Sequence, residues 1–147
     1  MTTTETTIDT LTTVLATRWQ AAANKFMDLA ATLPEGKFEA ELAGGARTCD
    51  AVLRHVAYWN RYVADTLNGR KADDSGNELS KKDYRDKAAV LGDLKKSSCE
   101  IASGLNRGLD DKSLQAFCMG LEHLSEHYGQ LAVYARLLGI TPPASRS

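Results

Sequence analysis

Four long stretches of the chain carry apolar residues at steps of three and four, and this spacing constrains the fold more than any other feature. No segment shows the alternation of apolar and polar residues that is typical of a half-buried strand. The four stretches predict helices over about residues 8–33, 49–67, 81–105 and 113–138. In a chain of 147 residues, four such helices favour an all-α protein folded as a four-helix bundle.

Residues with strong positional preferences mark the expected helix ends. Thr48 and Ser80 are good N-caps for the second and third helices, because their hydroxyls can accept a hydrogen bond from the first helical turn. The polar, glycine-containing segment 69–78 predicts a surface loop between these two helices. The expected stop signals are Pro34, Asn68-Gly69, Gly139 and Pro142-Pro143.

Composition fits one soluble domain over residues 1–147. Hydrophobic residues make up 43% of the chain and charged residues 25%. The 18 basic residues are scattered and are balanced by 19 acidic ones, which argues against a nucleic-acid partner, since phosphate binding needs clustered positive charge. No stretch is apolar for long enough to predict a membrane span, so no membrane partner is expected either.

The cysteines and the N-terminal residues indicate the cellular compartment in which the protein is expected. Three cysteines, an odd number without close pairing, favour a protein with reduced thiols. Residues 1–10 have neither a basic segment nor an apolar one, so we expect no signal peptide there. Together these features predict a cytoplasmic protein.

The histidines are the residues with the clearest chemical signal. The chain has three, and two of them, His123 and His127, lie four apart on the predicted fourth helix. Residues at this spacing are neighbours on one helix face, and the face also carries Leu131 and Tyr134. His55 lies on the apolar side of the predicted second helix. Three imidazoles from two helices can bind one divalent metal and leave positions open for water or substrate.

Alternatives to a metal site rest on the same residues. A histidine that faces a core is often a packed residue whose ring nitrogens are hydrogen-bonded. A pair of inward histidines needs hydrogen-bond partners for both rings. The segment from His123 to His127 also matches H-x-x-E-H, a zinc-peptidase pattern with Glu126 as base. No carboxylate follows Glu126 to complete such a site, so we reject that interpretation and expect a surface or supporting role for Glu126. Spacing gives no support to a site that includes Cys49, Cys99 or Cys118.

Two segments of the chain carry residue types in a fixed register. The first is LRHV at residues 53–56, and the second is HLSEHYGQLAVYARLLGITPP at residues 123–143. They resemble the DinB/YfiT-like family of small four-helix proteins, whose ending is H-x-x-x-H-x-G-Q-L-x-x-Y-x-R-x-x-G-x-x-P-P. The resemblance extends in outline over the chain, but residues 67–113 carry no assignable motif. Tyr128 stands where many relatives carry a basic residue, so a substrate contact there is expected to differ.

The resemblance implies an up-down-down-up bundle in which His55, His123 and His127 bind nickel or zinc, often in a homodimer. Some relatives are transferases or isomerases that use bacillithiol, mycothiol or a related low-molecular-weight thiol, and many have no assigned activity. These properties are expectations for the present chain.

Two functional hypotheses follow for the chain. The first is a metal-dependent enzyme, a thiol S-transferase or a hydrolase, in which Gln130 contacts a bound group and Trp59 and Tyr134 form the pocket wall. Aromatic residues at helical spacing are more often core residues, which is the alternative for Trp59 and Tyr134. The second is a non-enzymatic module in which the metal fixes the second helix to the fourth. A metal-free bundle is the third alternative. No residue stands out as a catalytic acid or base.

Overall fold

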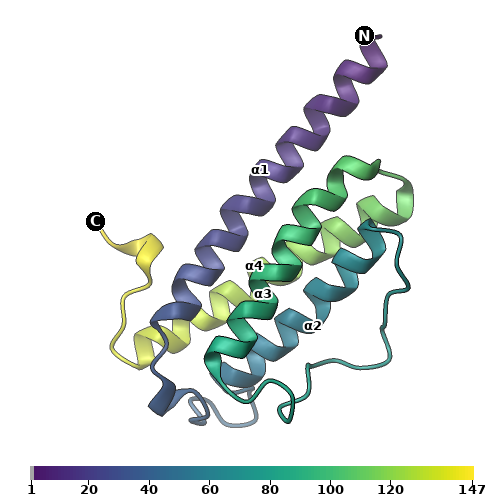
Figure 1. The fold of residues 1–147 in the computed structure, drawn as a ribbon. Coiled ribbons are helices and arrows are strands. Elements are labelled where there is room, and N and C mark those ends of the chain that lie inside the picture. Colours follow the sequence, from purple (N-terminus) through teal and green to yellow (C-terminus); the bar gives the residue numbers. More distant parts are fainter. Residues whose placement is uncertain (1) are drawn as a thin grey trace.

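A computed structural model describes residues 2–147, and within them all regular structure is helical. The chain forms α1 (Thr3–Thr32), α2 (Cys49–Leu67), α3 (Lys87–Gly104) and α4 (Asp111–Leu137), with three short 3-10 helices between and after them (Figure 1). The all-α prediction is therefore confirmed. Met1, which belongs to the predicted domain 1–147 and to the segment 1–10, lies outside the described residues.

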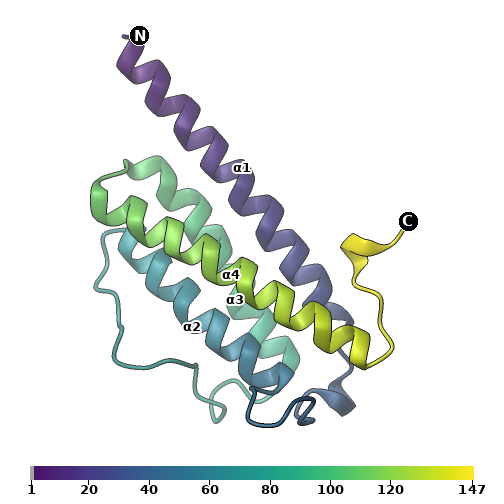
Figure 2. The same ribbon diagram turned by 180° about the vertical axis from the view of Figure 1, so that it is seen from behind.

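The four α-helices pack so that each contacts two others along its length. Helix α2 packs against α3 and α4, and α1 packs against the same two helices (Figures 1 and 2). The core between them is apolar, and each large side chain that it removes from water contributes roughly 1.5–3 kcal/mol. Its largest fully buried members include Trp19, Phe26, Leu53, Leu94, Phe117 and Leu131. None of the helices in residues 2–147 meets the length and hydropathy needed to cross a bilayer.

Helix α1 begins earlier than its apolar pattern predicts, at Thr3 instead of near Ile8. Its start is fixed by a capping box: the Glu5 N–H donates to Thr2 Oγ1 at 3.2 Å, and the Thr2 N–H donates to Glu5 Oε2 at 2.6 Å. The first turns of α1 extend past the end of the bundle in both views (Figures 1 and 2). Leu11, one of the apolar residues at helical spacing in this stretch, is 42% exposed, and the buried face of α1 starts at Trp19.

Helix α3 begins later than predicted, and its cap is a different residue. Ser80 does not cap a helix at residue 81: its hydroxyl and its carbonyl accept the N–H groups of Lys82 and Tyr84 in a local turn. The N-cap is Asp86, whose carboxylate accepts the Ala89 N–H at 2.8 Å. The other predicted cap, Thr48, is confirmed by a 3.2 Å hydrogen bond from the Ala51 N–H to its hydroxyl.

Residues 68–86, which we call the strap, connect α2 to α3 without regular helix or strand. Figure 1 shows the strap returning alongside α2. It is attached to that helix at several points. The Tyr58 hydroxyl donates to the Asp73 carbonyl at 2.9 Å and accepts the Gly76 N–H at 2.8 Å, and the Leu79 N–H donates to the Arg54 carbonyl at 3.1 Å. The predicted loop is thus confirmed as a loop, but one that is fastened to α2.

Helices α2 and α4 approach closely at a glycine. A Cβ atom added at Gly120 of α4 would lie 2.8 Å from Cγ2 of Val63 on α2, which is closer than Cβ contacts in real proteins. Gly120 precedes His123 by about one turn, so this approach brings α4 near α2 where the histidines lie. The α4 helix ends at Leu137, and Gly139 follows with a φ of 80°, the left-handed conformation of a glycine C-terminal stop.

Candidate metal centre

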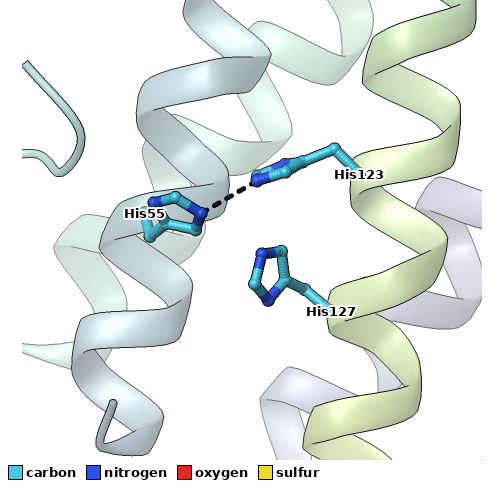
Figure 3. Close-up of side chains that lie close together, drawn as sticks. All are labelled: His55, His123 and His127. Carbon is cyan, nitrogen blue, oxygen red and sulfur yellow. Dashed lines mark hydrogen bonds between the residues drawn. The ribbon is translucent and has the colours of Figure 1, made fainter. Parts of the chain in front are cut away.

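The three histidines predicted as ligands lie together between α2 and α4. His55 projects from α2, and His123 and His127 project from α4 toward it (Figure 3). One ring nitrogen of each lies within 4.8 Å of the others, close enough to hold a single metal ion. His55 is buried, at 7% exposure, while His123 and His127 are half-buried.

The orientation of His55 is set by the strap. Its Nδ1 lies 2.7 Å from the backbone carbonyl oxygen of Asn77. A carbonyl oxygen only accepts hydrogen bonds, so Nδ1 must carry the proton. In the neutral ring, Nε2 is then an unprotonated acceptor, and it points toward His123 (Figure 3). This is the usual support of a metal-binding histidine, in which an acceptor holds the far nitrogen and exposes the other as a ligand.

The orientation of His127 is set by a chain of hydrogen bonds that ends on a backbone carbonyl. The Tyr134 hydroxyl donates to the Arg47 carbonyl at 2.7 Å, so the hydroxyl oxygen accepts from Gln130 Nε2 at 3.1 Å. The other atom of that amide, Oε1, therefore faces His127 Nδ1 at 2.8 Å. Because Oε1 is an acceptor, Nδ1 of His127 carries the proton and Nε2 is left free to bind a metal.

His123 has no such support in residues 2–147. Its Nε2 lies 2.9 Å from Nε2 of His55, and its Nδ1 is buried without a hydrogen-bond partner. Two unprotonated Nε2 atoms at this distance would repel each other, so they require either a shared proton or a shared cation between them. In the metal-free cluster, a proton on Nε2 of His123 can be donated to Nε2 of His55. A bound metal ion would take the place of that proton.

Two rings of the cluster, His55 and His123, are neutral near pH 7, as metal ligation requires. Burial lowers the pKa of His123 to about 4, and the positive charges of His127, His55 and Arg47 act in the same direction. Burial is also the main cause of the lowered pKa of His55, which its hydrogen bond to Asn77 partly opposes. These rings therefore offer lone pairs to a cation at neutral pH without first losing a charge.

The donor set fits a divalent transition metal. Three imidazole nitrogens are the ligands that zinc, nickel and copper share, and they suit Mg²⁺ or Ca²⁺ poorly because those ions prefer oxygen. Two of the three rings have their free nitrogen fixed toward the cluster by acceptors behind them. The nitrogen–nitrogen contact between His55 and His123 is the position where a cation would remove a repulsion.

Several residues near the cluster make contacts that the sequence does not predict. Gln130, expected to contact a bound group, supports His127 through its Oε1 atom. Tyr134, expected as pocket wall, is 4% exposed and bonds to Gln130 and Arg47. The Trp59 ring lies beside that of His123, with centroids 6.4 Å apart, and its Nε1–H donates to Asn77 Oδ1 at 2.9 Å. These contacts make Tyr134 and Trp59 part of the framework of the cluster.

The other candidates lie away from the cluster or outside its ligand set. Glu126 is exposed, which fits the surface role expected for it. Cys99 and Cys118 are exposed free thiols, and Cys49 is buried at the start of α2. The supporting groups that sequence reasoning missed are Asn77 and Arg47. Neither lies at a helical spacing from a histidine, and both act through a backbone carbonyl, which no residue type reveals.

Comparison with protein-family models and with curated proteins gives no match for this chain. The resemblance to the DinB/YfiT-like family therefore rests on the motif residues of the sequence alone.

Proposed function

We propose that this chain binds one nickel or zinc ion through His55, His123 and His127 and is a metal-dependent enzyme of the thiol S-transferase type, with hydrolysis as the related alternative. The observation that carries the proposal is the arrangement of the three rings. Acceptors behind His55 and His127 direct their Nε2 atoms into the space that they share with His123. The set of three histidine ligands supports catalysis, because a purely structural zinc site is usually closed by four protein ligands.

A divalent metal bound there would lower the pKa of a coordinated thiol or water and so supply a nucleophile near neutral pH. The residues of the chain prepare the site for this chemistry. Asn77 and Gln130 hold the Nδ1 protons of His55 and His127, which fixes both rings before any ligand arrives. The Trp59 ring lies beside that of His123, with ring centroids 6.4 Å apart.

The proposal is tested by elemental analysis of untagged protein beside a His55→Ala/His127→Ala double variant. We expect about one nickel or zinc per chain in the wild type and none in the double variant, as three shared ligands predict. Substituting both rings keeps the measurement free of partial ligation by a remaining pair. Wild-type protein that stays metal-free after incubation with both metals would overturn the proposal, and the histidines would then be core residues.

A structural metal is the second candidate function, and one observation favours it. The histidines join α2 to α4 and, through Asn77, both helices to the strap. A metal there would add folding free energy by linking three segments that are far apart in the sequence. Thermal unfolding with and without a chelator separates the candidates: a structural metal should be required for folding, whereas a catalytic one should be required mainly for activity.

The family assignment is part of the same proposal. DinB/YfiT-like membership is supported by the motif residues, and the up-down-down-up order of that family is supported by the strap, which returns alongside α2 before α3 begins (Figure 1). We also propose a homodimer, because the exposed apolar side chains of α1 would gain from a partner. These are Ile8, Leu11 and Val14, which are 52%, 42% and 51% exposed. A cytoplasmic setting agrees with the three free cysteines.

A further inference from the structure

The middle of the strap, which we call segment 76–79, is the part that contacts the histidine cluster. The Gly76 N–H donates to the Tyr58 hydroxyl at 2.8 Å, and the Leu79 N–H donates to the Arg54 carbonyl at 3.1 Å. The Leu79 side chain belongs to the hydrophobic core. Backbone amides at both ends of this segment are therefore bonded to α2.

Asn77, within this segment, is bonded to α2 through two different atoms. Its backbone carbonyl accepts the His55 Nδ1–H at 2.7 Å, and its side-chain Oδ1 accepts the Trp59 Nε1–H at 2.9 Å. His55 and Trp59 lie four residues apart and so are neighbours on one face of the helix. The first is a proposed metal ligand, and the ring of the second lies beside that of His123. Asn77 thus connects the strap to the metal centre.

The two ends of the strap are held by contacts that do not involve the cluster. Near its start, the Arg70 N–H donates to the Asp65 carbonyl at 2.8 Å. Near its end, the Tyr84 N–H donates to the Ser80 carbonyl at 3.0 Å, within a turn of the strap itself. Segment 76–79 can therefore separate from α2 while both of these hydrogen bonds stay in place.

The hydrogen bond from His55 to Asn77 depends on what the other ring nitrogen of His55 binds. A cation on Nε2 confines the ring proton to Nδ1, the nitrogen that faces Asn77. The cation also draws electron density from the ring, and an N–H group with more positive charge donates a stronger hydrogen bond. An occupied cluster therefore binds the strap more tightly than an empty one.

The same coupling acts in the other direction. When two equilibria are linked, each changes the equilibrium constant of the other by the same factor. A supporting partner of a metal-bound histidine typically contributes roughly 10–100-fold to the metal affinity. Docking of the strap should therefore raise the metal affinity by about 10–100-fold, and metal binding should lower the population of the undocked segment by the same factor.

We propose that segment 76–79 responds to the metal: a metal bound by the three histidines strengthens its attachment to α2 through Asn77, and loss of the metal makes its release more frequent. The inference rests on the proposed function, since it concerns the same site, and it holds for a catalytic metal and for a structural one. Release uncovers Leu79, which is 5% exposed in the docked strap. The metal-free protein therefore presents more often an apolar residue that the metal-bound protein covers.

The experiment is amide hydrogen exchange, resolved by residue with NMR, of the zinc-loaded protein and of the protein kept metal-free by a chelator. The amides to follow are those of Gly76 and Leu79, whose hydrogen bonds to α2 break when the segment opens. We expect zinc to slow their exchange by about 10–100-fold, the factor given by the coupling. Zinc content is measured in the same samples.

The amides of Arg70 and Tyr84 are the internal reference. They belong to the same strap, but their hydrogen bonds do not depend on segment 76–79. Zinc that only made the whole protein more stable would slow these amides as much as those of Gly76 and Leu79. Zinc that acts through the histidine cluster should slow Gly76 and Leu79 by about tenfold more than the reference amides.

Two variants show whether the effect passes through the cluster and through Asn77. His123→Ala/His127→Ala deletes two ligands and leaves the strap contacts of α2 in place, so zinc should no longer slow the exchange of the segment. Asn77→Ala keeps the backbone carbonyl but removes the acceptor of the Trp59 N–H, so the segment should open about tenfold more often with or without zinc. Asn106→Ala makes the same change at an exposed position between α3 and α4, and as the matched control it should exchange like the wild type.

The outcomes separate this inference from the proposed function. Zinc-loaded protein in which Gly76 and Leu79 are slowed no more than the reference amides overturns the inference and leaves the metal site standing. Equal slowing in the wild type and in the double histidine variant would mean that zinc acts elsewhere, and it overturns the inference as well. Wild-type exchange in Asn77→Ala overturns the role of Asn77. Protein that holds no zinc or nickel overturns the metal site, and the inference falls with it.

Discussion

His127 and His55 are supported by the same chemistry but by different kinds of structure. His127 is held by Gln130, three residues further along α4. His55 is held by the Asn77 carbonyl, which belongs to the strap and lies 22 residues away in the sequence. One support therefore forms with the helix, whereas the other forms only when the strap docks on α2. The comparison shows that a three-histidine cluster can depend on tertiary structure for one ligand and on local structure for another.

The difference has an energetic side. Ordering the backbone of a residue in a segment without regular structure costs about 1–2 kcal/mol, and the strap must recover this through its contacts with α2. Those contacts involve Tyr58, Arg54, Trp59 and His55, all of them on α2. The His55 side of the cluster should therefore be the side that loosens first.

Removal of a histidine ligand should lower the metal affinity most, and the loss should be similar for His55 and for His127. His55→Ala and His127→Ala each delete one of three metal ligands, so the metal affinity of each should fall by more than the roughly 10–100-fold that is typical of losing a supporting residue. Competition with a chelator measures the affinities. If one variant kept most of its affinity, that histidine would not be a ligand, and the comparison of the two supports would lose its basis.

Loss of the local support should have the next largest effect. Gln130→Ala leaves Nδ1 of His127 without its acceptor and breaks the chain to Tyr134, so we expect metal affinity to fall about 10–100-fold. Gln130→Glu keeps an acceptor at Oε1 and should restore much of the affinity. The same chelator competition measures both variants. Equal affinity in Gln130→Ala and wild type would show that the α4 helix alone orients His127.

Loosening the strap should have a smaller effect, because the Asn77 carbonyl remains in the chain. Tyr58→Phe removes the hydroxyl that bonds Asp73 and Gly76, and we expect metal affinity to fall about tenfold, the value of the hydrogen bonds lost. Tyr62→Phe is the matched control, since it makes the same change one turn along α2. Equal behaviour of the two variants would mean that strap docking does not control His55.

The pH dependence of the metal-free protein should be the smallest effect, and it concerns His123, the unsupported ring. Its pKa is about 4 in the folded state, against 6.5 for an ordinary histidine, so the unfolded chain binds more protons between these values. The free energy of unfolding should therefore be highest above pH 6.5 and fall as the pH is lowered toward 4. We expect His123 to contribute about 1 kcal/mol of this loss, since solvent screening of the half-buried ring reduces the effect.

Urea unfolding at pH 7 and pH 5 in the presence of a chelator measures this dependence. In His123→Gln the stability difference between the two pH values should be smaller, and the part that remains would come from His55, whose pKa is also lowered by burial. An unchanged difference would place the titrating group elsewhere.

Local patterns predict much of this molecule, and the parts that they miss are those made by tertiary contacts. The bounds of α2 and its Thr48 cap follow from local signals, and the His123–His127 pair follows from helical spacing. The predicted start of α3 was wrong because Ser80 closes a turn and Asp86 caps the helix. Ser and Asp are common both in turns and at helix N-caps, so the residue type alone does not separate the two structures. The Asn77 carbonyl could not be predicted, since every residue has a carbonyl and only the docked strap selects this one.

The early start of α1 has a consequence for how the two halves of that helix respond to amide hydrogen exchange. Residues near Trp19 and Phe26 are covered by the bundle, so their amides should exchange only when larger parts of the protein open. Residues 3–14 are exposed apart from the half-buried Thr12, and a helix this short is marginal alone in water. Their amides should exchange quickly in a monomer, and protection there at rising protein concentration would locate a subunit contact.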